Sequence, residues 1–207
     1  IVILSAAKVG GIKANNKYRA DFIRENLQIQ TNIIHGCHLN NINNLIFLGS
    51  SCVYPKKCKL PIKEGYLLSG KLEVTNEPYA IAKIAGIKMC ESYNKQYNRN
   101  YISLMPTNTF GPGDNYDLEN SHFIPAILRK LHQAKINKKK FIHLWGTGKP
   151  KREIIYVDDL ANAIIYFINK KTSHSLINIG NSKEYSIKNI ANKIVKILDL
   201  KIKIKFD

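Results

Sequence analysis

The sequence predicts an α/β protein with a doubly wound parallel sheet, and two observations support this class. Short apolar runs that are typical of buried strands alternate with longer segments of helical periodicity along most of the 207 residues. The strand-like runs are separated by whole helices, and such crossovers join parallel strands that carry helices on both faces of the sheet. Ligands of such sheets bind at the carboxyl ends of the strands.

In the first half of the chain, buried strands and long helices take turns. We expect strands at 1–6, 45–49 and 102–106, and helices at 14–41 and 79–97. Residues 56–77 are punctuated by Pro, Gly and Ser, and residues 111–120 are rich in Gly, Pro, Asp and Asn. Both segments are therefore predicted to be loops.

The second half continues the alternation with shorter elements. We expect helices at 123–133, 158–169 and 186–200, and strands at 141–145, 176–180 and 201–206. Asp158 or Asp159 is the expected cap of the second helix, and Ser186 that of the third. The last strand alternates Lys with apolar residues, which is typical of a half-exposed edge strand.

The charge of the chain is strongly basic, with a formal value of +17, and Lys-rich stretches occur at 135–140 and 201–205. The lysines are nevertheless scattered, and aromatic residues do not interleave with them as a base-stacking platform requires. We therefore expect no nucleic-acid partner. A non-catalytic module, whose basic surface binds nucleic acid or an anionic membrane, remains as a second hypothesis.

Hydrophobic content is ordinary, at 44%, and no run of 18 apolar residues exists, so we expect no membrane-spanning helix. Cys37, Cys52, Cys58 and Cys90 are too few and too irregularly spaced for a disulfide framework or a zinc site. A cytoplasmic location and the absence of a bound metal are the expectations.

Tyr79 and Lys83 lie four residues apart on a predicted helix, one turn from each other. An ammonium beside a phenol favours the phenolate, so we expect a lowered pKa for Tyr79. A Ser at the end of the 45–49 strand can hydrogen-bond the same substrate oxygen. Such a trio passes a proton to or from a carbonyl or alcohol, which is chemistry that accompanies hydride transfer.

Longer strings around these residues resemble the extended short-chain dehydrogenase/reductase superfamily, also called the NAD-dependent epimerase/dehydratase family, and within it the GDP-L-fucose synthase branch. The resemblance runs from about residue 3 to about residue 170. The specific strings are 6–12 (AAKVGGI), 47–55 (FLGSSCVYP), 75–91 (TNEPYAIAKIAGIKMCE), 105–108 (MPTN), 120–126 (NSHFIPA) and 145–148 (WGTG).

The resemblance also implies that parts of the family fold are absent. The family opens with a strand and a Gly-rich turn that seats the cofactor pyrophosphate, and this chain has no such turn. We expect residues 1–113 to be a partial NAD(P)-binding domain, truncated at its N-terminus. Residues 114–207 would mix segments of a smaller substrate domain with returning Rossmann-like elements. Expressed alone, such a piece is expected to fold weakly, and its own activity is left open.

For chemistry, the resemblance implies NADPH-dependent conversion of GDP-4-dehydro-6-deoxy-D-mannose to GDP-L-fucose, by 3,5-epimerisation and then 4-reduction. Tyr79 would donate a proton to O4, and Lys83 would support it and bind the cofactor ribose. Ser50 would hydrogen-bond the keto oxygen, with Ser51 as the competing candidate. Cys52 would be the base of the epimerisation and His122 the acid, which requires a lowered pKa for the Cys52 thiol.

For binding, the resemblance implies NADP(H), although the residues that choose between NADPH and NADH belong to the absent part. The expected cofactor-binding residues are Leu48, Gly49, Ser50, Ser51, Lys83, Pro106, Thr107, Asn108, Thr109 and His122. Lys130, Trp145 and Arg152 would bind the GDP-sugar, although Trp145 can equally belong to the core. The helices 14–41 and 79–97 would pair with their copies in a homodimer.

A third hypothesis is another nucleotide-sugar epimerase or reductase of the same superfamily. The presence of both Cys52 and His122 favours the dual-function enzyme, because a simple 4-epimerase does not need them.

Overall fold

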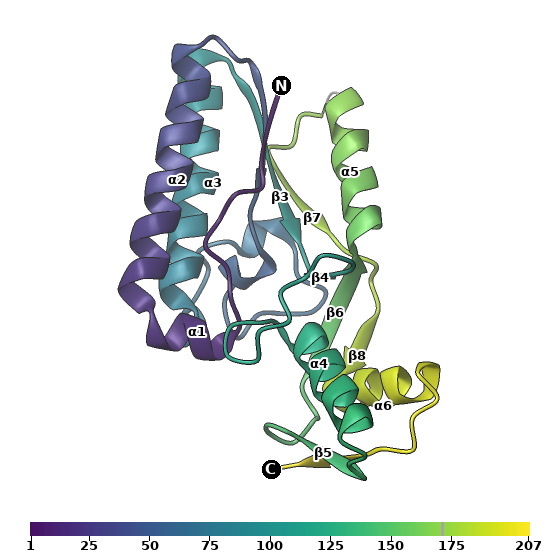
Figure 1. Cartoon of the computed structure of the whole chain (residues 1–207). Helices are drawn as coiled ribbons and strands as arrows, with labels where there is room; N and C mark the ends of the chain where they lie inside the picture. The colour runs from purple at the N-terminus through teal and green to yellow at the C-terminus, as the bar shows by residue number, and fades with distance from the viewer. Residues whose placement is uncertain (171) are drawn as a thin grey trace.

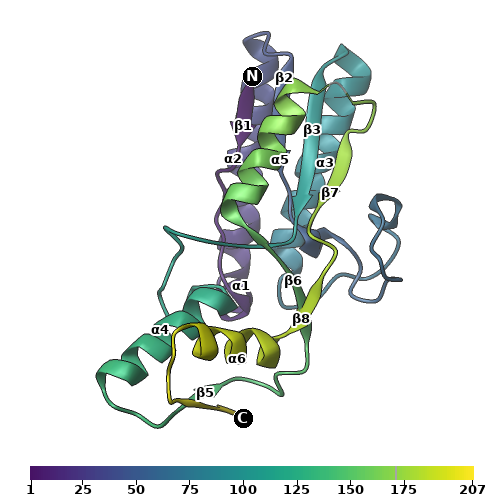
Figure 2. The same cartoon turned by 90° about the vertical axis from the view of Figure 1, so that its right-hand side faces the viewer.

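The computed structural model describes residues 1–170 and 172–207. Its central element is a four-stranded sheet in the order β1-β2-β3-β7, in which every neighbouring pair is parallel (Figures 1 and 2). The predicted parallel sheet is therefore confirmed. The strands are β1 (Val2–Leu4), β2 (Asn44–Leu48), β3 (Asn100–Pro106) and β7 (Leu176–Ile179).

Helices cover both faces of this sheet. α2 (Arg19–Leu39) and α3 (Glu77–Tyr97) lie side by side on one face, and α5 (Val157–Asn169) lies on the other (Figures 1 and 2). Successive side chains of a strand point to opposite faces. Leu45 and Phe47 accordingly belong to the core beneath α2 and α3, whereas Ile46 belongs to the core beneath α5.

A separate apolar core forms below the sheet. It joins α4 (Phe123–Ile136), β5 (Phe141–Leu144), α6 (Ile187–Ile197) and β9 (Lys203–Phe206), with Leu131 fully buried (Figure 2). β5 and β9 pair in parallel, and exposure alternates along β9, which confirms the expected edge strand.

Three short strands that were not predicted link the two cores. β4 (Asn108–Phe110) follows β3 almost directly and pairs with β6 (Lys151–Tyr156), which pairs in turn with β8 (Glu184–Ser186). β4 and β8 have only three residues each and so carry too little periodicity to be recognised, and β6 is defined by its pairing with both of them.

The expected helix over 14–41 is wrong in one respect, because it is broken. α1 (Ile12–Lys17) and α2 are separated at Tyr18, whose backbone is not helical (φ −108°, ψ 43°). The amide of Asn15 anchors α1 by donating to the carbonyls of Gly10 and Gly11, whereas α2 packs along the sheet. Tyr18 takes up the change of direction between them.

The expected helix caps are confirmed in one case and wrong in the other. The Ser186 hydroxyl accepts a hydrogen bond from the backbone of Asn189 at 3.1 Å and caps α6. α5 instead begins after Tyr156, which makes no side-chain cap, and Asp158 and Asp159 lie in the first turn. Their carboxylates can still favour the helix through its dipole.

Among the described residues, no helix combines the length and apolar character that crossing a bilayer requires.

The interface between α3 and the sheet is expected to contribute most to the stability of the core beneath α2 and α3. Ile87 on α3 is fully buried, so Ile87→Ala should lower the free energy of unfolding by about 2–5 kcal/mol. Ile165→Ala on α5, where the side chain is 54% exposed, is the matched control and should change it by less than about 1 kcal/mol. Denaturant unfolding of the full-length protein measures both, and equal losses would contradict this assignment of the core.

Candidate active site

The carboxyl end of β2 is held against β3 by a close backbone approach. The Gly49 N–H donates to the Leu104 carbonyl at 2.9 Å, which continues the strand pairing past Leu48. A Cβ at Gly49 would lie 2.0 Å from the terminal methyl carbon of Met105, so only glycine fits here without displacing that side chain. The chain then turns away from the sheet into the 3₁₀ helix η1 (Ser51–Val53).

Ser50 lies at the centre of a small cluster. Its hydroxyl accepts a hydrogen bond from the Cys52 N–H at 3.4 Å and caps η1. Its side chain also lies near those of Tyr79 and Cys52, where it lowers the pKa of each. Of the two candidate serines, Ser50 therefore contacts the other proposed catalytic groups, while Ser51 is the first residue of η1 and half-buried.

Lys83 is buried, with an exposed fraction of 2%, and joins α3 to the sheet. Its Nζ donates to the Leu48 carbonyl at 2.8 Å and lies 4.7 Å from the centroid of the Phe47 ring. The same nitrogen lies 5.8 Å from the centroid of the Tyr79 ring. Burial lowers the pKa of Lys83 to about 8, and an electrostatic interaction with Cys52 opposes the shift only in part.

The expected acidification of Tyr79 and Cys52 is wrong. Burial, reinforced by the Cys52 charge, raises the pKa of Tyr79 well above its ordinary value, despite the opposing effect of Ser50. Burial likewise raises the pKa of Cys52 to about 11, despite Ser50 and Lys83. Desolvation outweighs the ammonium here, so both groups are protonated at neutral pH.

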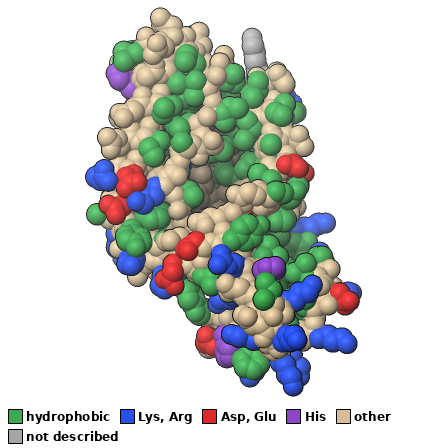
Figure 3. Space-filling model, viewed as in Figure 1, with side chains coloured by type: hydrophobic (Ala, Val, Ile, Leu, Met, Phe, Trp, Pro, Cys, Tyr) green, Lys and Arg blue, Asp and Glu red, His purple; other side chains and the backbone are tan. Residues whose placement is uncertain are grey.

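His122 lies at the N-cap of α4 and not on the four-stranded sheet. Its side chain is open to solvent on one side, but the protein atoms around it lower its pKa by desolvation, with Asp114 opposing. Among the described residues, no hydrogen bond joins His122 to Ser50, Cys52, Tyr79 or Lys83. The space-filling view shows this face of the molecule hollowed in the middle, between the sheet and the lower part (Figure 3).

The segment between β3 and β4 carries the other predicted cofactor residues. After Pro106, the Thr107 N–H donates to the Ile179 carbonyl at 3.0 Å, and the Asn108 amide donates to the Glu153 carbonyl at 2.9 Å. The Thr109 hydroxyl donates to the Thr107 carbonyl at 3.4 Å. The Thr107 hydroxyl oxygen is buried and has no hydrogen-bond partner within the described part of the chain, so it is available to a ligand.

The three predicted substrate residues lie on the lower part of the molecule, where Lys and Arg side chains gather (Figure 3). Lys130 Nζ donates to the His143 carbonyl at 2.9 Å and lies 5.3 Å from the centroid of the Trp145 ring. Trp145 is 66% exposed, which excludes the core alternative. Arg152 lies apart from this pair on β6, half-buried, and donates to the Lys151 carbonyl at 2.7 Å.

Comparison with known proteins identifies the family. The profile of the NAD dependent epimerase/dehydratase family matches residues 1–180. The chain belongs to this family. The expected resemblance is thereby confirmed, and the match includes β2, α3 and the segment between β3 and β4.

Several relatives within this epimerase/dehydratase family are similar over the whole chain. The GDP-L-fucose synthase of Escherichia coli is 51% identical over 100% of this chain and 67% of its own length, and GDP-L-fucose synthase 1 of Arabidopsis thaliana is 50% identical over 100% and 64%. The chain thus spans about two thirds of these relatives. A GDP-D-glycero-L-gluco-heptose synthase of Campylobacter jejuni, solved in the presence of NADPH, is 38% identical over 99% of this chain and 72% of that one, with a TM-score of 0.89.

The structure adds neighbours that sequence reasoning missed. The Phe22 ring on α2 meets the Tyr79 ring edge-on, with 6.4 Å between centroids, and Phe47 faces the Lys83 ammonium. Phe22 belongs to no motif, and Phe47, although it opens the string 47–55, carries no sign in the sequence that it contacts the ammonium. Within the described residues, no group of three or more His, Cys, Asp or Glu side chains has an arrangement that could hold a metal ion.

Lys83 is expected to impose a pH dependence on stability. Its folded-state pKa of about 8 lies below the ordinary 10.5, so the unfolded chain binds this proton more tightly. The buried Lys83 ammonium therefore lowers the free energy of unfolding by its full amount below pH 8. This loss disappears as the pH rises to about 10.5. The stability of the wild type relative to Lys83→Met should rise by up to roughly 3 kcal/mol over this range.

Denaturant unfolding of the full-length protein at a series of pH values measures this difference. Lys95→Met, which removes an exposed lysine from the same helix, is the matched control and should follow the wild-type profile. Parallel profiles for the wild type and Lys83→Met would show that the buried ammonium does not titrate in this way.

Proposed function

We propose that the full-length protein converts GDP-4-dehydro-6-deoxy-D-mannose to GDP-L-fucose, with NADPH as the reductant, by epimerisation at C3 and C5 followed by reduction at C4. The observation that carries the proposal is the cluster of Ser50, Cys52, Tyr79 and Lys83 at the carboxyl end of β2. The names of the two relatives at 50–51% identity support the substrate class.

The reduction needs a proton donor at O4, and the protonated Tyr79 suits this role. When bound, NADPH supplies a hydride to C4 of the ketone. The Tyr79 hydroxyl donates its proton to O4, while Ser50 hydrogen-bonds the same oxygen and the Lys83 ammonium stabilises the phenolate that remains. Water then returns a proton to Tyr79.

The residues around the cluster fit a nicotinamide cofactor. The buried Thr107 hydroxyl has no protein partner among the described residues, and the glycine at position 49 lets the carboxyl end of β2 lie close against Met105 of β3. We propose that Lys83 and His122, together with the segments 48–51 and 106–109, hold the nicotinamide half of NADP(H). The choice of NADPH follows the relative solved in its presence.

The epimerisation needs two groups on opposite faces of the sugar. We assign Cys52 as the base that removes a proton from C3 or C5, with the resulting enolate spread onto O4, where Tyr79 and Ser50 donate hydrogen bonds. His122 returns a proton to the opposite face. Because burial keeps the Cys52 thiol protonated, the Lys83 ammonium is needed to stabilise the reactive thiolate.

The GDP part of the substrate would bind to the lower part of the molecule. Lys130 and Arg152 provide positive charge for the diphosphate, and the exposed Trp145 ring offers an apolar face. Lys130 is a single point charge, so it gives less geometric control than a bidentate guanidinium. In this arrangement residues 1–113 bind mainly the cofactor, and residues 114–207 contribute the substrate-binding segments.

An experiment in deuterated water separates the two half-reactions. Full-length wild type, Tyr79→Phe, Cys52→Ser and His122→Asn receive GDP-4-dehydro-6-deoxy-D-mannose and NADPH. Tyr79→Phe should reduce the ketone about 100- to 10,000-fold more slowly and still exchange deuterium at C3 and C5, at a lower rate, because Ser50 still donates to O4 of the enolate and Cys52 is unchanged. Cys52→Ser and His122→Asn should lose the exchange.

Nicotinamide absorbance follows the reduction, and mass spectrometry follows the deuterium. Lys95→Met, which removes an exposed lysine near the other end of α3 from Tyr79, is a control and should keep both activities within a few-fold. A wild type that neither oxidises NADPH nor exchanges deuterium would overturn the proposal.

The alternative within the family is reduction or epimerisation of a different GDP-sugar. The 38% identity to a GDP-heptose synthase is the observation that favours it. The two functions differ in the sugar that fits beside Trp145 and His122. A competition between the 6-deoxyhexose and the corresponding heptose ketone, scored by kcat/KM, decides between them.

We further propose that the protein is a cytoplasmic homodimer that pairs through α2 and α3. These helices lie side by side, and Ile33, Ile81 and Tyr97 are 39–44% exposed on them. Cys37, Cys52, Cys58 and Cys90 are all free thiols, which suits a reducing compartment.

Light scattering of the full-length protein should therefore give twice the chain mass. Ile33→Glu should shift it to the monomer, because a charge in an apolar interface is desolvated without a partner. Ile165→Glu on α5 is the matched control and should stay dimeric. A monomeric wild type would contradict the pairing.

A further inference from the structure

The segment Lys8–Gly11 connects β1 to α1 and is held by side chains on both sides. It belongs to the string Ala6–Ile12, which is specific in sequence but has no role in the chemistry above. The segment lies against α2 on one side and against the residues that precede His122 on the other. Its function therefore has to be sought in what it holds in place.

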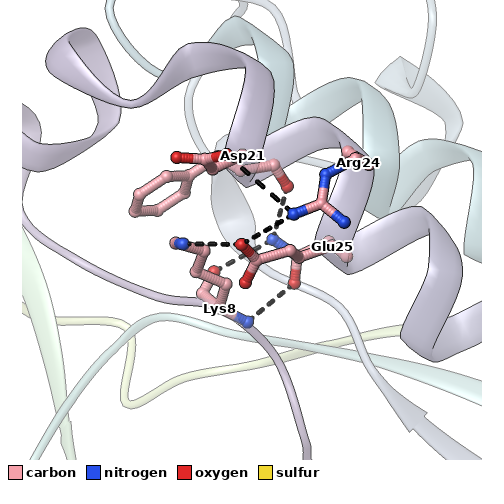
Figure 4. Close-up of polar contacts among 6 residues, drawn as sticks. Lys8, Asp21, Arg24 and Glu25 are labelled. Carbon is pink, nitrogen blue, oxygen red and sulfur yellow. Dashed lines mark hydrogen bonds and ion pairs between the residues drawn. The ribbon is translucent and has the colours of Figure 1, made fainter.

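Asn26 fixes the beginning of the segment from α2. Its side chain is buried, and its Oδ1 accepts from the Lys8 N–H at 3.0 Å while its Nδ2 donates to the Lys8 carbonyl at 3.0 Å. The amide thus pairs with both backbone groups of one residue, as a neighbouring strand would. Figure 4 shows Lys8 beside α2, where its ammonium pairs with Glu25 at 2.8 Å.

Asn15 fixes the end of the segment from α1. It is 6% exposed, and its Nδ2 donates to the carbonyls of Gly10 at 2.7 Å and Gly11 at 3.1 Å. Backbone carbonyls at three positions of a four-residue segment are therefore bound by two buried amides. The segment therefore has little conformational freedom, because a buried hydrogen-bonding group that loses its partner costs free energy.

Gly11 connects this rigid segment to the backbone that precedes His122. The Gly11 N–H donates to the Asn120 carbonyl at 2.9 Å, two residues before His122. A Cβ at Gly11 would lie only 2.5 Å from the Ser121 carbonyl oxygen, well inside ordinary contact, so the two backbones touch. The position of the Ser121–His122 peptide is therefore set by the segment.

The same segment also contacts the surroundings of Tyr79. A Cβ at Gly10 would lie 3.2 Å from the tip of the Phe22 ring, and Phe22 meets Tyr79 edge-on. The segment thus touches one neighbour of each of the two proposed proton donors, of which Tyr79 lies on α3 and His122 at the N-cap of α4.

We propose that Gly11 is a positioning residue that sets His122 at the correct distance from the Cys52–Tyr79 cluster for proton return during epimerisation. The proposal rests on the role of His122 in the proposed function. A larger side chain at position 11 moves the backbone before His122, and a catalytic group misplaced by the order of 1 Å loses about 100-fold in rate.

The test is Gly11→Ala in the full-length enzyme, with Gly36→Ala as the matched control, because a Cβ at Gly36 meets no atom within 4 Å. Deuterium exchange at C3 and C5 should slow about 10- to 100-fold in Gly11→Ala and stay within twofold in Gly36→Ala. Asn15→Ala is the milder second variant, with about a fivefold loss, should Gly11→Ala fold poorly.

A double-mutant cycle with His122→Asn distinguishes positioning from general damage. If Gly11 acts through His122, Gly11→Ala and Asn15→Ala should have almost no further effect on the residual exchange of His122→Asn. Losses that multiply would overturn the proposal, as would an exchange rate for Gly11→Ala and Asn15→Ala equal to that of Gly36→Ala. If His122→Asn itself exchanges like the wild type, the proposed function of His122 fails instead.

Discussion

The hydrogen bond from the Lys83 ammonium to the Leu48 carbonyl is the constraint on which the site depends. It ties the second turn of α3 to the carboxyl end of β2, at 2.8 Å, and the Phe47 ring lies against the same ammonium. A buried cation without these partners would be strongly destabilising, so the helix has little freedom to slide along the sheet. Tyr79, one turn earlier on α3, is thereby held beside Ser50.

Desolvation decides the protonation states of this cluster. It raises the pKa of Tyr79 and Cys52 and lowers that of Lys83, so all three groups tend toward their neutral forms. A neutral phenol suits the donation of a proton to an alkoxide that forms during hydride transfer. A neutral thiol suits the base role proposed for Cys52 less well, and its thiolate needs the Lys83 ammonium nearby, which lowers the pKa of the thiol.

Elements with a periodicity of their own could be predicted from the sequence, whereas features that depend on partners distant in the chain could not. β2, β3 and α3 carry their own periodicity and were recognised, whereas β6 exists only through its pairing with β4 and β8. The spacing of Tyr79 and Lys83 placed them on one helix face. It could not show that the ammonium donates to Leu48, or that burial reverses the pKa shift expected for the phenol.

Two separately packed parts of the molecule contribute side chains to the proposed reaction. Tyr79 and Cys52 depend on the core beneath α2 and α3, while His122 begins α4, whose apolar side packs on β5 and α6. Proton transfer tolerates only small changes in distance, so the junction between the cores has to be as rigid as the cores themselves. The side-chain amides of Asn15 and Asn26 hydrogen-bond the backbone of Lys8–Gly11. These bonds make the junction rigid without burying apolar surface.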